Sequence, residues 1–360
     1  MDIFQDALSL GFGDIHFKFD RATGLRAIIA IHNTHLGPAL GGCRCLSYPS
    51  TEAAIVDAMR LARSMTYKAA ISGLPQGGGK SVLMCPTPIR DREAYFESFG
   101  RFIDELGGRY ITAVDSGTSV ADMDVIARTT KYVACTSAGS AGTDDPSPHT
   151  AVGVRRGLEA AVKFKLGRTD LDGIHVAIQG VGHVGYPLAS QLHERGARLT
   201  VSDVNKAAVE RCVDEFDADV VEPEDIYDVE CDVFSPNALG AVVSDDTLLR
   251  LRTKIVGGAA NNQLAESRHG DALHKRGILY APDYAINAGG VIQIVTDKSA
   301  LNERLSGIYD TLMRIFEQSA KKDEAPHHVA DGMVDAILAS PAKNLRSSRL
   351  PATDKNNLDA

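Results

Sequence analysis

The chain has 360 residues, of which 44% are hydrophobic and 24% are charged, and its formal net charge at pH 7 is −9. These values are ordinary for a soluble globular protein with room for two domains, and the negative charge disfavours sequence-independent binding of nucleic acid. No apolar run reaches the length of about 18 residues that suggests a transmembrane helix, and the N-terminus lacks the basic and apolar regions of a signal peptide. We therefore expect a cytoplasmic protein without a membrane or nucleic-acid partner.

Cysteine usage indicates a reducing compartment. The six cysteines are scattered along the chain, and Cys43 and Cys45 are too close for a Cys-x-x-Cys pair, with no second pair further along. Reduced thiols are expected in such a chain. Cys43 and Cys45 are expected to be buried and inert, with thiol sensitivity as the alternative. The sequence shows no metal-ligand spacing, so no metal site is expected.

The N-terminal elements begin with a predicted β-hairpin. Residues 15–19 alternate apolar and polar side chains, and residues 25–31 form a second apolar run after a short turn. Residues 36–44 are rich in glycine and are expected to form a loop that ends in an arginine. Ser50 or Thr51 is expected to cap the helix that follows.

Two lysines bracket the next glycine-rich stretch. Leu61, Met65 and Lys68 are spaced i, i+4, i+7, so Lys68 continues the apolar stripe of a helix. A charge in that position either extends into water or meets an anion. Lys80 follows Gly77–Gly79, which we expect to form a loop whose backbone can approach a ligand closely. This stretch can therefore place two ammonium groups around one small anionic molecule.

Two other interpretations of this stretch stay open from the residues alone. A phosphate-binding P-loop requires glycine five residues before the last one, but that position is Leu74, and Gly73 is one residue too early. The segment before the loop also has a helical pattern and not that of a buried strand. A surface loop with solvated lysines is the second alternative.

The next predicted elements are a helix over 92–106, a strand over 110–114 and a helix over 121–130. Asp115 stands at the end of the strand. It is either a functional carboxylate or a cap for the helix that follows residue 117. Residues 136–150 are small and include prolines, which is typical of a domain boundary.

The second half has an α/β rhythm. After a predicted helix over 151–164, six apolar strand candidates alternate with helical patterns, as in a doubly wound parallel sheet. A long helix, either continuous or broken, is expected over 289–320, and the tail after about residue 342 is polar. We predict a domain over 1–140, joined by the segment after about 330, and a Rossmann-type domain over 141–330. The strand candidates are 175–179, 198–202, 219–221, 232–235, 254–257 and 278–281.

A dinucleotide-binding motif follows the first of these strands. Gly180-Val181-Gly182-His183-Val184-Gly185 is a Gly-x-Gly-x-x-Gly sequence between the strand and a helix. Its glycines permit a tight turn, backbone approach to a pyrophosphate and close packing of helix on strand. Asp203, at the end of the next strand, can accept hydrogen bonds from ribose hydroxyls and repel a 2′-phosphate. The motif therefore predicts NAD as cofactor in preference to NADP, with a turn that binds no ligand as the alternative.

Eight motifs in order resemble the Glu/Leu/Phe/Val amino-acid dehydrogenase family, and leucine dehydrogenases in particular. The resemblance extends from the predicted hairpin to about residue 340. The position of Asn237 is often cysteine in leucine dehydrogenases, so this chain resembles a divergent member. The motifs are Gly37–Arg44, Met65–Lys68, Gly77–Lys80, Thr112–Asp115, Asp145–Thr150, Gly180–Gly185, Gly257–Asn262 and Asn287–Val291.

The resemblance implies an α/β fold with an N-terminal substrate-binding and oligomerisation domain, followed by the Rossmann-type domain. It also implies a homo-oligomeric enzyme that converts an L-amino acid to a 2-oxo acid and ammonia while NAD is reduced, in the cleft between the domains. By the same match, Lys68 and the Gly41–Gly42 backbone would bind the substrate carboxylate, and Lys80 and Asp115 would be the catalytic pair. Asn262 would hold the substrate, and the nicotinamide side would be lined by Thr150, Ala238, Asn261 and Asn287.

Substrate preference is expected to follow from an apolar pocket. Glutamate-specific relatives have a lysine at the position of Leu40, and an unpaired second carboxylate would be costly to bury here. Leucine, valine or isoleucine is therefore the expected substrate, with phenylalanine as an alternative. Other apolar wall residues would be Met65, Ala113, Val291 and Ile294.

Two other classes of function remain open at this point. One is an NAD-binding protein with an inactive site, which the presence of Lys68, Lys80 and Asp115 disfavours. The other is a 2-hydroxy-acid dehydrogenase, whose chemistry needs a His–carboxylate pair. His149 and His183 show no such pairing in the sequence.

Overall fold

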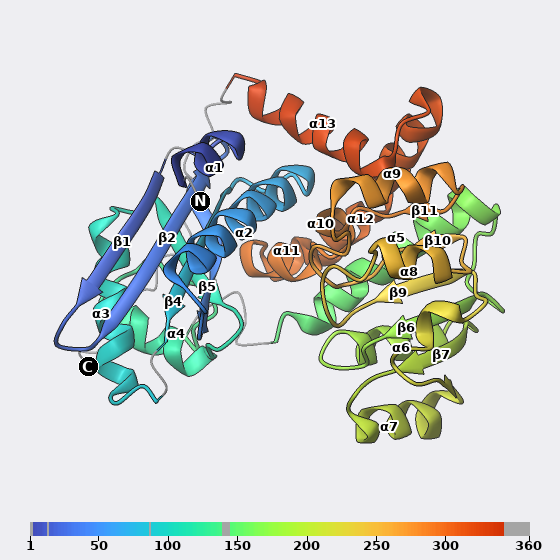
Figure 1. The fold of residues 1–360 in the computed structure, drawn as a ribbon, viewed down its shortest axis with the longest axis horizontal. Coiled ribbons are helices and arrows are strands. Elements are labelled where there is room, and N and C mark those ends of the chain that lie inside the picture. The colour runs from blue at the N-terminus through green and yellow to red at the C-terminus, as the bar shows by residue number, and fades with distance from the viewer. Residues whose placement is uncertain (1–2, 13, 86–87, 139–144, 342–360) are drawn as a thin grey trace. The chain divides into compact units, whose positions relative to one another are not determined.

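The computed structural model describes residues 3–12, 14–85, 88–138 and 145–341. Their packing divides them into two compact units, one drawn from Met1–Asp144 and Ala336–Ala360 and the other from Asp145–Asp335 (Figure 1). The predicted polar tail lies outside the described residues, as does the middle of the predicted boundary segment. The division into functional domains at residues 140 and 330 stays a prediction.

The first unit is built on a five-stranded mixed sheet with the strand order β1-β2-β4-β3-β5. β1 and β2 form the predicted antiparallel hairpin, whereas β3 lies parallel to β4 on one side and to β5 on the other. The strands are β1 (Asp14–Asp20), β2 (Leu25–Asn33), β3 (Ala39–Leu46), β4 (Gly77–Met84) and β5 (Tyr110–Val114).

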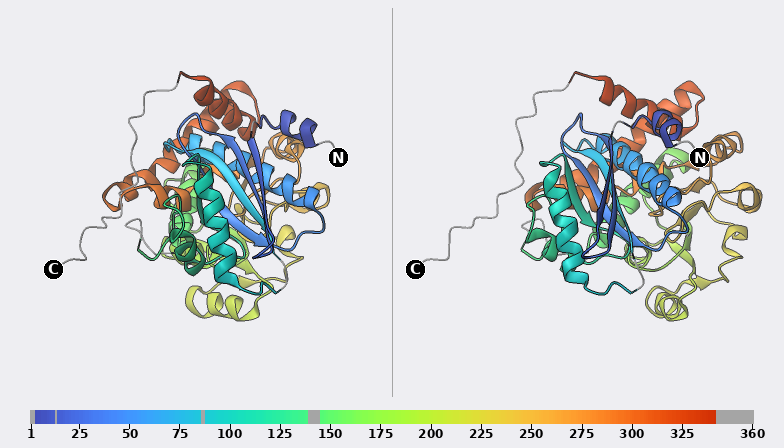
Figure 2. Two further views of the ribbon diagram at one scale, coloured as in Figure 1. Left: turned by 90° about the vertical axis from the view of Figure 1, so that its left-hand side faces the viewer. Right: turned by 60° about the vertical axis from the view of Figure 1, so that its left-hand side comes forward.

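Helices cover both faces of this sheet (Figure 2). Apolar side chains of α2 pack against Ile28, Ala30 and Val82 on one face, and those of α3 and α4 pack with Leu25 and Leu83 on the other. Ser50 caps α2, as predicted, by accepting a hydrogen bond from the backbone N–H of Ala53. The helices are α1 (Ile3–Ser9), α2 (Thr51–Ile71), α3 (Arg92–Glu105) and α4 (Val120–Ala127).

The two predicted glycine-rich loops are wrong, because most of each is a buried strand. A side chain at Gly78 would place its Cβ 2.0 Å from the Thr66 backbone nitrogen of α2. A Cβ at Gly41 would lie 1.8 Å from the Gly79 carbonyl oxygen on the neighbouring strand. Glycine is a poor strand former on its own. Here it is required because β3, β4 and α2 approach each other too closely for any side chain.

The second unit contains a six-stranded parallel sheet with the order β11-β10-β9-β6-β7-β8. In chain order from β6 this is 3-2-1-4-5-6, the arrangement of doubly wound dinucleotide-binding folds. All six predicted strands are confirmed. They are β6 (His175–Gln179), β7 (Arg198–Ser202), β8 (Asp219–Val220), β9 (Val233–Pro236), β10 (Ile255–Val256) and β11 (Leu279–Tyr280).

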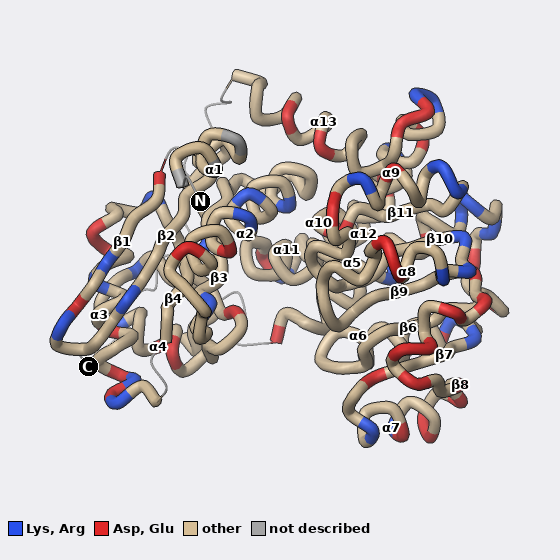
Figure 3. The backbone as a smooth tube through the Cα atoms, viewed as in Figure 1, with Lys and Arg blue, Asp and Glu red and all other residues tan. Residues whose placement is uncertain are grey.

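Helices alternate with these strands, and the central strands β6 and β9 contain no charged residue (Figure 3). The helix predicted over 289–320 is broken between α11 and α12. The helices are α5 (Ser147–Leu166), α6 (Gly185–His193), α7 (Lys206–Phe216), η1 (Ile226–Asp228), α8 (Asp245–Arg250), α9 (Ser267–Lys275), α10 (Asp283–Ile286), α11 (Gly289–Val295), α12 (Lys298–Lys322) and α13 (Pro326–Ala339). Of the helices in the described ranges, none combines the length and apolar character that a membrane span requires.

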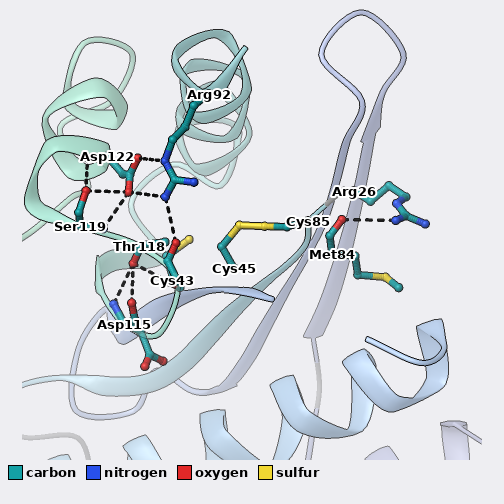
Figure 4. Close-up of a disulfide and its surroundings, with 11 residues drawn as sticks. Arg26, Cys43, Cys45, Met84, Cys85, Arg92, Asp115, Thr118, Ser119 and Asp122 are labelled. Carbon is teal, nitrogen blue, oxygen red and sulfur yellow. Dashed lines mark hydrogen bonds and ion pairs between the residues drawn. A yellow bond between two sulfur atoms is a disulfide. The ribbon is translucent and has the colours of Figure 1, made fainter. Parts of the chain in front are cut away.

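A disulfide between Cys45 and Cys85 corrects the expectation that all thiols are reduced (Figure 4). It joins the end of β3 to the residue that follows β4, and these two strands are neighbours in the sheet. The two cysteines are 40 residues apart in the chain, which is why spacing alone does not reveal the pair. Cys43 is free and buried, and burial raises the pKa of its thiol to about 12, so it is inert as expected.

The disulfide is expected to stabilise the first unit. A bridge across 40 residues restricts the unfolded chain, so the double substitution Cys45→Ala and Cys85→Ala should lower the free energy of unfolding by about 2–4 kcal/mol. Urea unfolding measures this change. Cys135→Ala, which removes a free cysteine of the same unit, is the matched control, and a reductant added to the parent chain should reproduce the loss. Equal stability of the parent and the double variant would contradict a stabilising bridge.

Candidate active site

The predicted residues of the first unit gather on the face of its sheet that α2 covers. Side chains alternate between the two faces of a strand. Lys80 therefore shares its face with Val82, which packs against α2. Pairing of Gly42 with Ala113 extends this face onto β5. The residues on it are Leu40, Gly42 and Arg44 of β3, Lys80 of β4 and Ala113 and Asp115 at β5.

Lys80 is a buried cation with a carboxylate partner. It is only 6% exposed, and its Nζ forms an ion pair with Oδ2 of Asp115. Burial, followed by the positive charge of Arg44, lowers the pKa of Lys80 from its ordinary 10.5 to about 7. The direction agrees with the lowered pKa that nearness to Lys68 and partial desolvation predict for Lys80 from the sequence. A substantial neutral fraction near pH 7 makes Lys80 suitable as a proton acceptor.

Asp115 is fixed by the turn that follows β5. Its Oδ1 accepts a hydrogen bond of 2.7 Å from the backbone N–H of Ser116, and its own backbone N–H donates to Oγ1 of Thr118 at 3.0 Å. Gly42 leaves room for it, because a Cβ there would lie 2.7 Å from the Cβ of Asp115. The capping alternative is wrong, since Ser119 caps α4.

Arg44 and Asp57 belong to this cluster, although the sequence did not assign them a role. The Arg44 guanidinium lies 3.0 Å from Asp57 and 3.7 Å from Oδ2 of Asp115. The hydroxyl of Tyr48 donates to Asp57 at 2.6 Å. The sequence pattern that placed Lys68 on one face of α2 could also have identified Asp57. Asp57 stands one turn before Leu61 on the same face of the helix.

Lys68 and the apolar residues complete this group. Lys68 is half-buried in the last turn of α2, and its charge is one of those that lower the pKa of Lys80. The structure therefore brings the two predicted ammonium groups together with Asp115. Leu40 and Ala113 are buried beside them, and Met65 is half-buried on α2.

Gly41 and Gly42 lie in a strand, with a gap in its pairing. The ladder between β3 and β4 pairs Leu40 with Gly78 and Cys43 with Ser81, but Gly41 and Gly42 have no pairing residue on β4. The carbonyl oxygen of Gly41 instead accepts a hydrogen bond of 2.7 Å from the Tyr110 hydroxyl. The proposed carboxylate-binding backbone is thus an interruption within a sheet and not a loop.

The glycine motif of the second unit has the shape that its spacing predicts. Gly180 has a φ of 89°, which favours glycine. A Cβ at Gly185 would lie 1.9 Å from the Gly180 carbonyl oxygen, whereas nothing lies within 4 Å of one at Gly182. The first and third glycines thus serve the turn and the packing of α6, and the second faces open space, as backbone approach to a pyrophosphate requires.

Asp203 supports this loop directly. Its Oδ2 accepts a hydrogen bond of 2.8 Å from the backbone N–H of Val181, and its Oδ1 accepts one from Asn205 at 2.8 Å. Val184 occupies the N-cap position of α6. His183 is exposed, with its ring 3.6 Å from Asp145, so it is not the buried His–carboxylate pair of a hydroxy-acid dehydrogenase.

Asn287 provides a second feature that suits a ligand. Its amide nitrogen donates to the Ala259 carbonyl at 3.0 Å and to Asn261 Oδ1 at 2.9 Å. Its own side-chain oxygen is buried and has no hydrogen-bond partner among the described residues. A buried acceptor without a partner is costly. The N–H group of a bound carboxamide, such as that of nicotinamide, would satisfy it.

The remaining predicted residues of this unit lie around these two features. Ala238 packs over the glycine turn, since a Cβ at Gly180 would lie 2.6 Å from its own Cβ. Thr150 donates to the Pro146 carbonyl at 3.0 Å. Asn262 is exposed with a φ of 51°, and Val291 is buried in α11. The residues present therefore fit a dinucleotide, and their roles stay predictions.

Comparisons with known proteins agree with this geometry. Residues 13–132 match the model of the Glu/Leu/Phe/Val dehydrogenase dimerisation domain, and residues 200–323 match that of Glutamate/Leucine/Phenylalanine/Valine dehydrogenase. The chain is 52% identical to leucine dehydrogenase of Thermoactinomyces intermedius, covering 99% of this chain and 98% of that one. It is 48% identical to leucine dehydrogenase of Bacillus cereus, with 97% of each covered. The crystal structure of L-tryptophan dehydrogenase from Nostoc punctiforme superposes with a TM-score of 0.81 at 39% identity, covering 93% of this chain and 98% of that one.

The depressed pKa of Lys80 should make stability depend on pH. Between the folded pKa of about 7 and the unfolded value of 10.5, the unfolded chain holds a proton that the folded chain lacks, so stability rises with pH. Compared with Lys80→Met, the parent's free energy of unfolding should rise by at most about 1.4 kcal/mol per pH unit above pH 7. Below pH 7 it should show no such rise. Urea unfolding at pH 6 and 9 measures this difference. Exposed Lys131→Met is the control, and parallel profiles for parent and Lys80→Met would contradict a depressed pKa.

Proposed function

The chain belongs to the Glu/Leu/Phe/Val dehydrogenase family, and we propose that it deaminates branched-chain L-amino acids oxidatively and reversibly. The products would be the 2-oxo acid, ammonia and NADH. The buried Lys80–Asp115 pair carries this proposal, because its groups match the proton transfers of amine oxidation. Identities of 48% and 52% over nearly the whole chain to leucine dehydrogenases support the same reaction.

The charge of the first unit's cluster suits an amino-acid carboxylate. Its cations are Arg44, Lys68 and Lys80, and its carboxylates are Asp57 and Asp115. While Lys80 is protonated, three positive charges against two negative ones leave one positive charge in excess, and Lys68 keeps its charge when Lys80 is neutral. We assign the α-carboxylate of the substrate to Lys68, with the backbone of Gly41 and Gly42 beside it.

Lys80 and Asp115 would move the protons of the reaction. Hydride can leave the substrate Cα only when its amine is neutral, so a base must first take a proton. The resulting iminium is then attacked by water, and the carbinolamine loses ammonia. A lysine that is partly neutral near pH 7 can activate the water, and the adjacent carboxylate can relay protons. Lys80 is therefore assigned as the base and Asp115 as its relay.

The second unit would hold the dinucleotide, whose nicotinamide ring supplies the hydride acceptor when it is bound. The open backbone at Gly182 and the N-terminal end of α6 suit the pyrophosphate. The buried oxygen of Asn287 suits the carboxamide, with Thr150, Ala238 and Asn261 as further lining residues. Asp203 would select NAD by repelling a 2′-phosphate.

Apolar side chains favour a branched-chain substrate. Leu40 and Ala113 are buried next to Lys80, and Leu40 is only 3% exposed. The side-chain carboxylate of a glutamate substrate would meet Leu40 and not a lysine, and burying that carboxylate unpaired would be costly. Met65 of α2 and Val291 of the second unit are assigned as further substrate contacts, with Asn262 holding the substrate's polar end.

Two alternatives are less favoured. The likeness to the L-tryptophan dehydrogenase structure suggests an aromatic substrate, and phenylalanine is the family substrate nearest in character. An inactive NAD-binding protein is disfavoured by the presence of Lys68, Lys80 and Asp115. We also propose that the chain forms a homo-oligomer, which the matched dimerisation domain supports, and that it acts in the cytoplasm in branched-chain amino-acid catabolism.

NADH formation at 340 nm from a panel of L-amino acids tests this function. Leucine, valine and isoleucine should be oxidised faster than phenylalanine, and glutamate should not react. Lys80→Met should lower kcat by about 100-fold or more, whereas exposed Lys131→Met should leave it unchanged. Turnover of phenylalanine alone would favour the aromatic alternative. NAD binding without turnover of any substrate would identify the inactive alternative.

The role of Asp203 is tested by cofactor preference. Asp203→Asn removes the charge and retains an oxygen that can accept the Val181 hydrogen bond. The ratio of kcat/KM for NADP to that for NAD should rise at least about tenfold, which corresponds to about 1.4 kcal/mol. Asp214→Asn, at an exposed position of α7, is the control. An unchanged ratio would show that Asp203 does not exclude the 2′-phosphate.

A further inference from the structure

Two adjacent histidines at the start of α13 lie against one face of α9. Ser267, Asp271 and His274 are spaced i, i+4, i+7, so they share that face of α9. His327 is packed closely onto it, because a Cβ at Gly270 would lie 2.4 Å from its ring. His328 is partly exposed beside it. The function proposed above uses none of these residues.

The nitrogen and oxygen atoms of this cluster converge. The Nε2 of His328 is 2.9 Å from Oδ1 of Asp271, and the Nε2 of His327 is 3.9 Å from the same oxygen. One ligand atom from each of Asp271, His327 and His328 lies within 4.8 Å of the others. The rings of His327 and His328 are 4.0 Å apart.

We propose that Asp271, His327 and His328 form a binding site for Zn²⁺. Two imidazoles and one carboxylate are a common zinc donor set, with a fourth position for water. Zinc bonds of about 2.0–2.1 Å place tetrahedral ligand atoms about 3.4 Å apart, and the observed separations of 2.9 and 3.9 Å lie on either side of that value. Small rotations of the partly exposed His328 and Asp271 side chains would adjust them.

Packing holds one of the three ligands in place, because His327 is only 7% exposed. Ser267 Oγ lies 3.1 Å from the Nε2 of His327, so a bound zinc ion would replace this hydrogen bond. His274 lies on the same face of α9 with its ring 3.2 Å from Asp323, and it is not one of the proposed ligands. The bound ion would join α9 to the first turn of α13.

A second cluster in the same unit shows by contrast what makes this one suitable. Asp245, Glu266 and His269 also converge, but Arg268 already pairs with Asp245 at 2.6 Å and with Glu266 at 2.9 Å. Its carboxylates therefore have their cation. Within the described part of the chain, Asp271 forms ion pairs only with the two histidines.

Zinc binding by the untagged, chelator-treated full chain tests the proposal. Isothermal titration with ZnCl₂ should show one site per chain, and Co²⁺ should give the visible absorption of a four-coordinate ion. Zinc should also raise the midpoint of thermal unfolding. His328→Ala and Asp271→Asn alter partly exposed side chains, and each should weaken binding at least about tenfold.

Asp245→Asn is the matched control, since it removes a carboxylate of the second cluster and should leave zinc affinity unchanged. No saturable binding by the parent chain would overturn the proposal, as would equal affinity in the parent and in His328→Ala. Loss of binding in Asp245→Asn with retention in Asp271→Asn would move the site to the second cluster. Because binding is measured without substrate, these outcomes are independent of whether the chain oxidises amino acids.

Discussion

The pairing of a buried lysine with a carboxylate is the constraint on which the first unit's site depends. A charged Lys80 at 6% exposure would be costly without a partner. Asp115 provides that partner, and the turn after β5 fixes it through Ser116 and Thr118. Gly42 is required for the same reason, because a side chain there would occupy the space of Asp115. One ion pair thus accounts for residues on three strands, because Lys80 of β4 meets Asp115 at the end of β5 across Gly42 of the intervening β3.

Close backbone packing is the second constraint, and it explains why two strands rich in glycine have the sequence pattern of loops. Gly41 and Gly77–Gly79 have the composition of loops, yet they lie in strands whose neighbours leave no room for a Cβ. The composition of a segment shows that its residues are glycines, but not which structural requirement selects them. A turn that needs a positive φ and a strand pressed against a helix both select glycine, so local pattern cannot distinguish them.

Periodic signals and long-range contacts differ in how well the sequence predicts them. Patterns within short stretches of sequence predict three features of the structure. They are the six strands of the second unit, the Gly180–Gly185 turn and the face of α2 that carries Lys68. The Cys45–Cys85 bond and the contact of Asp271 with His328 join residues 40 and 57 positions apart. No spacing rule covers such pairs, because the intervening fold decides whether they meet.

Arg44 illustrates how the structure refines a correct prediction. Nearness to Lys68 and partial burial predict a low pKa for Lys80 from the sequence. In the structure, burial and then Arg44 are the larger causes, and Lys68 contributes less. This order matters for the proposed reaction. A substrate carboxylate on Lys68 would offset the positive charge that lowers the pKa of Lys80 less, and would leave the larger effect of Arg44 in place. Burial and Arg44 would still hold the pKa of Lys80 down, so the base would stay available while substrate is bound.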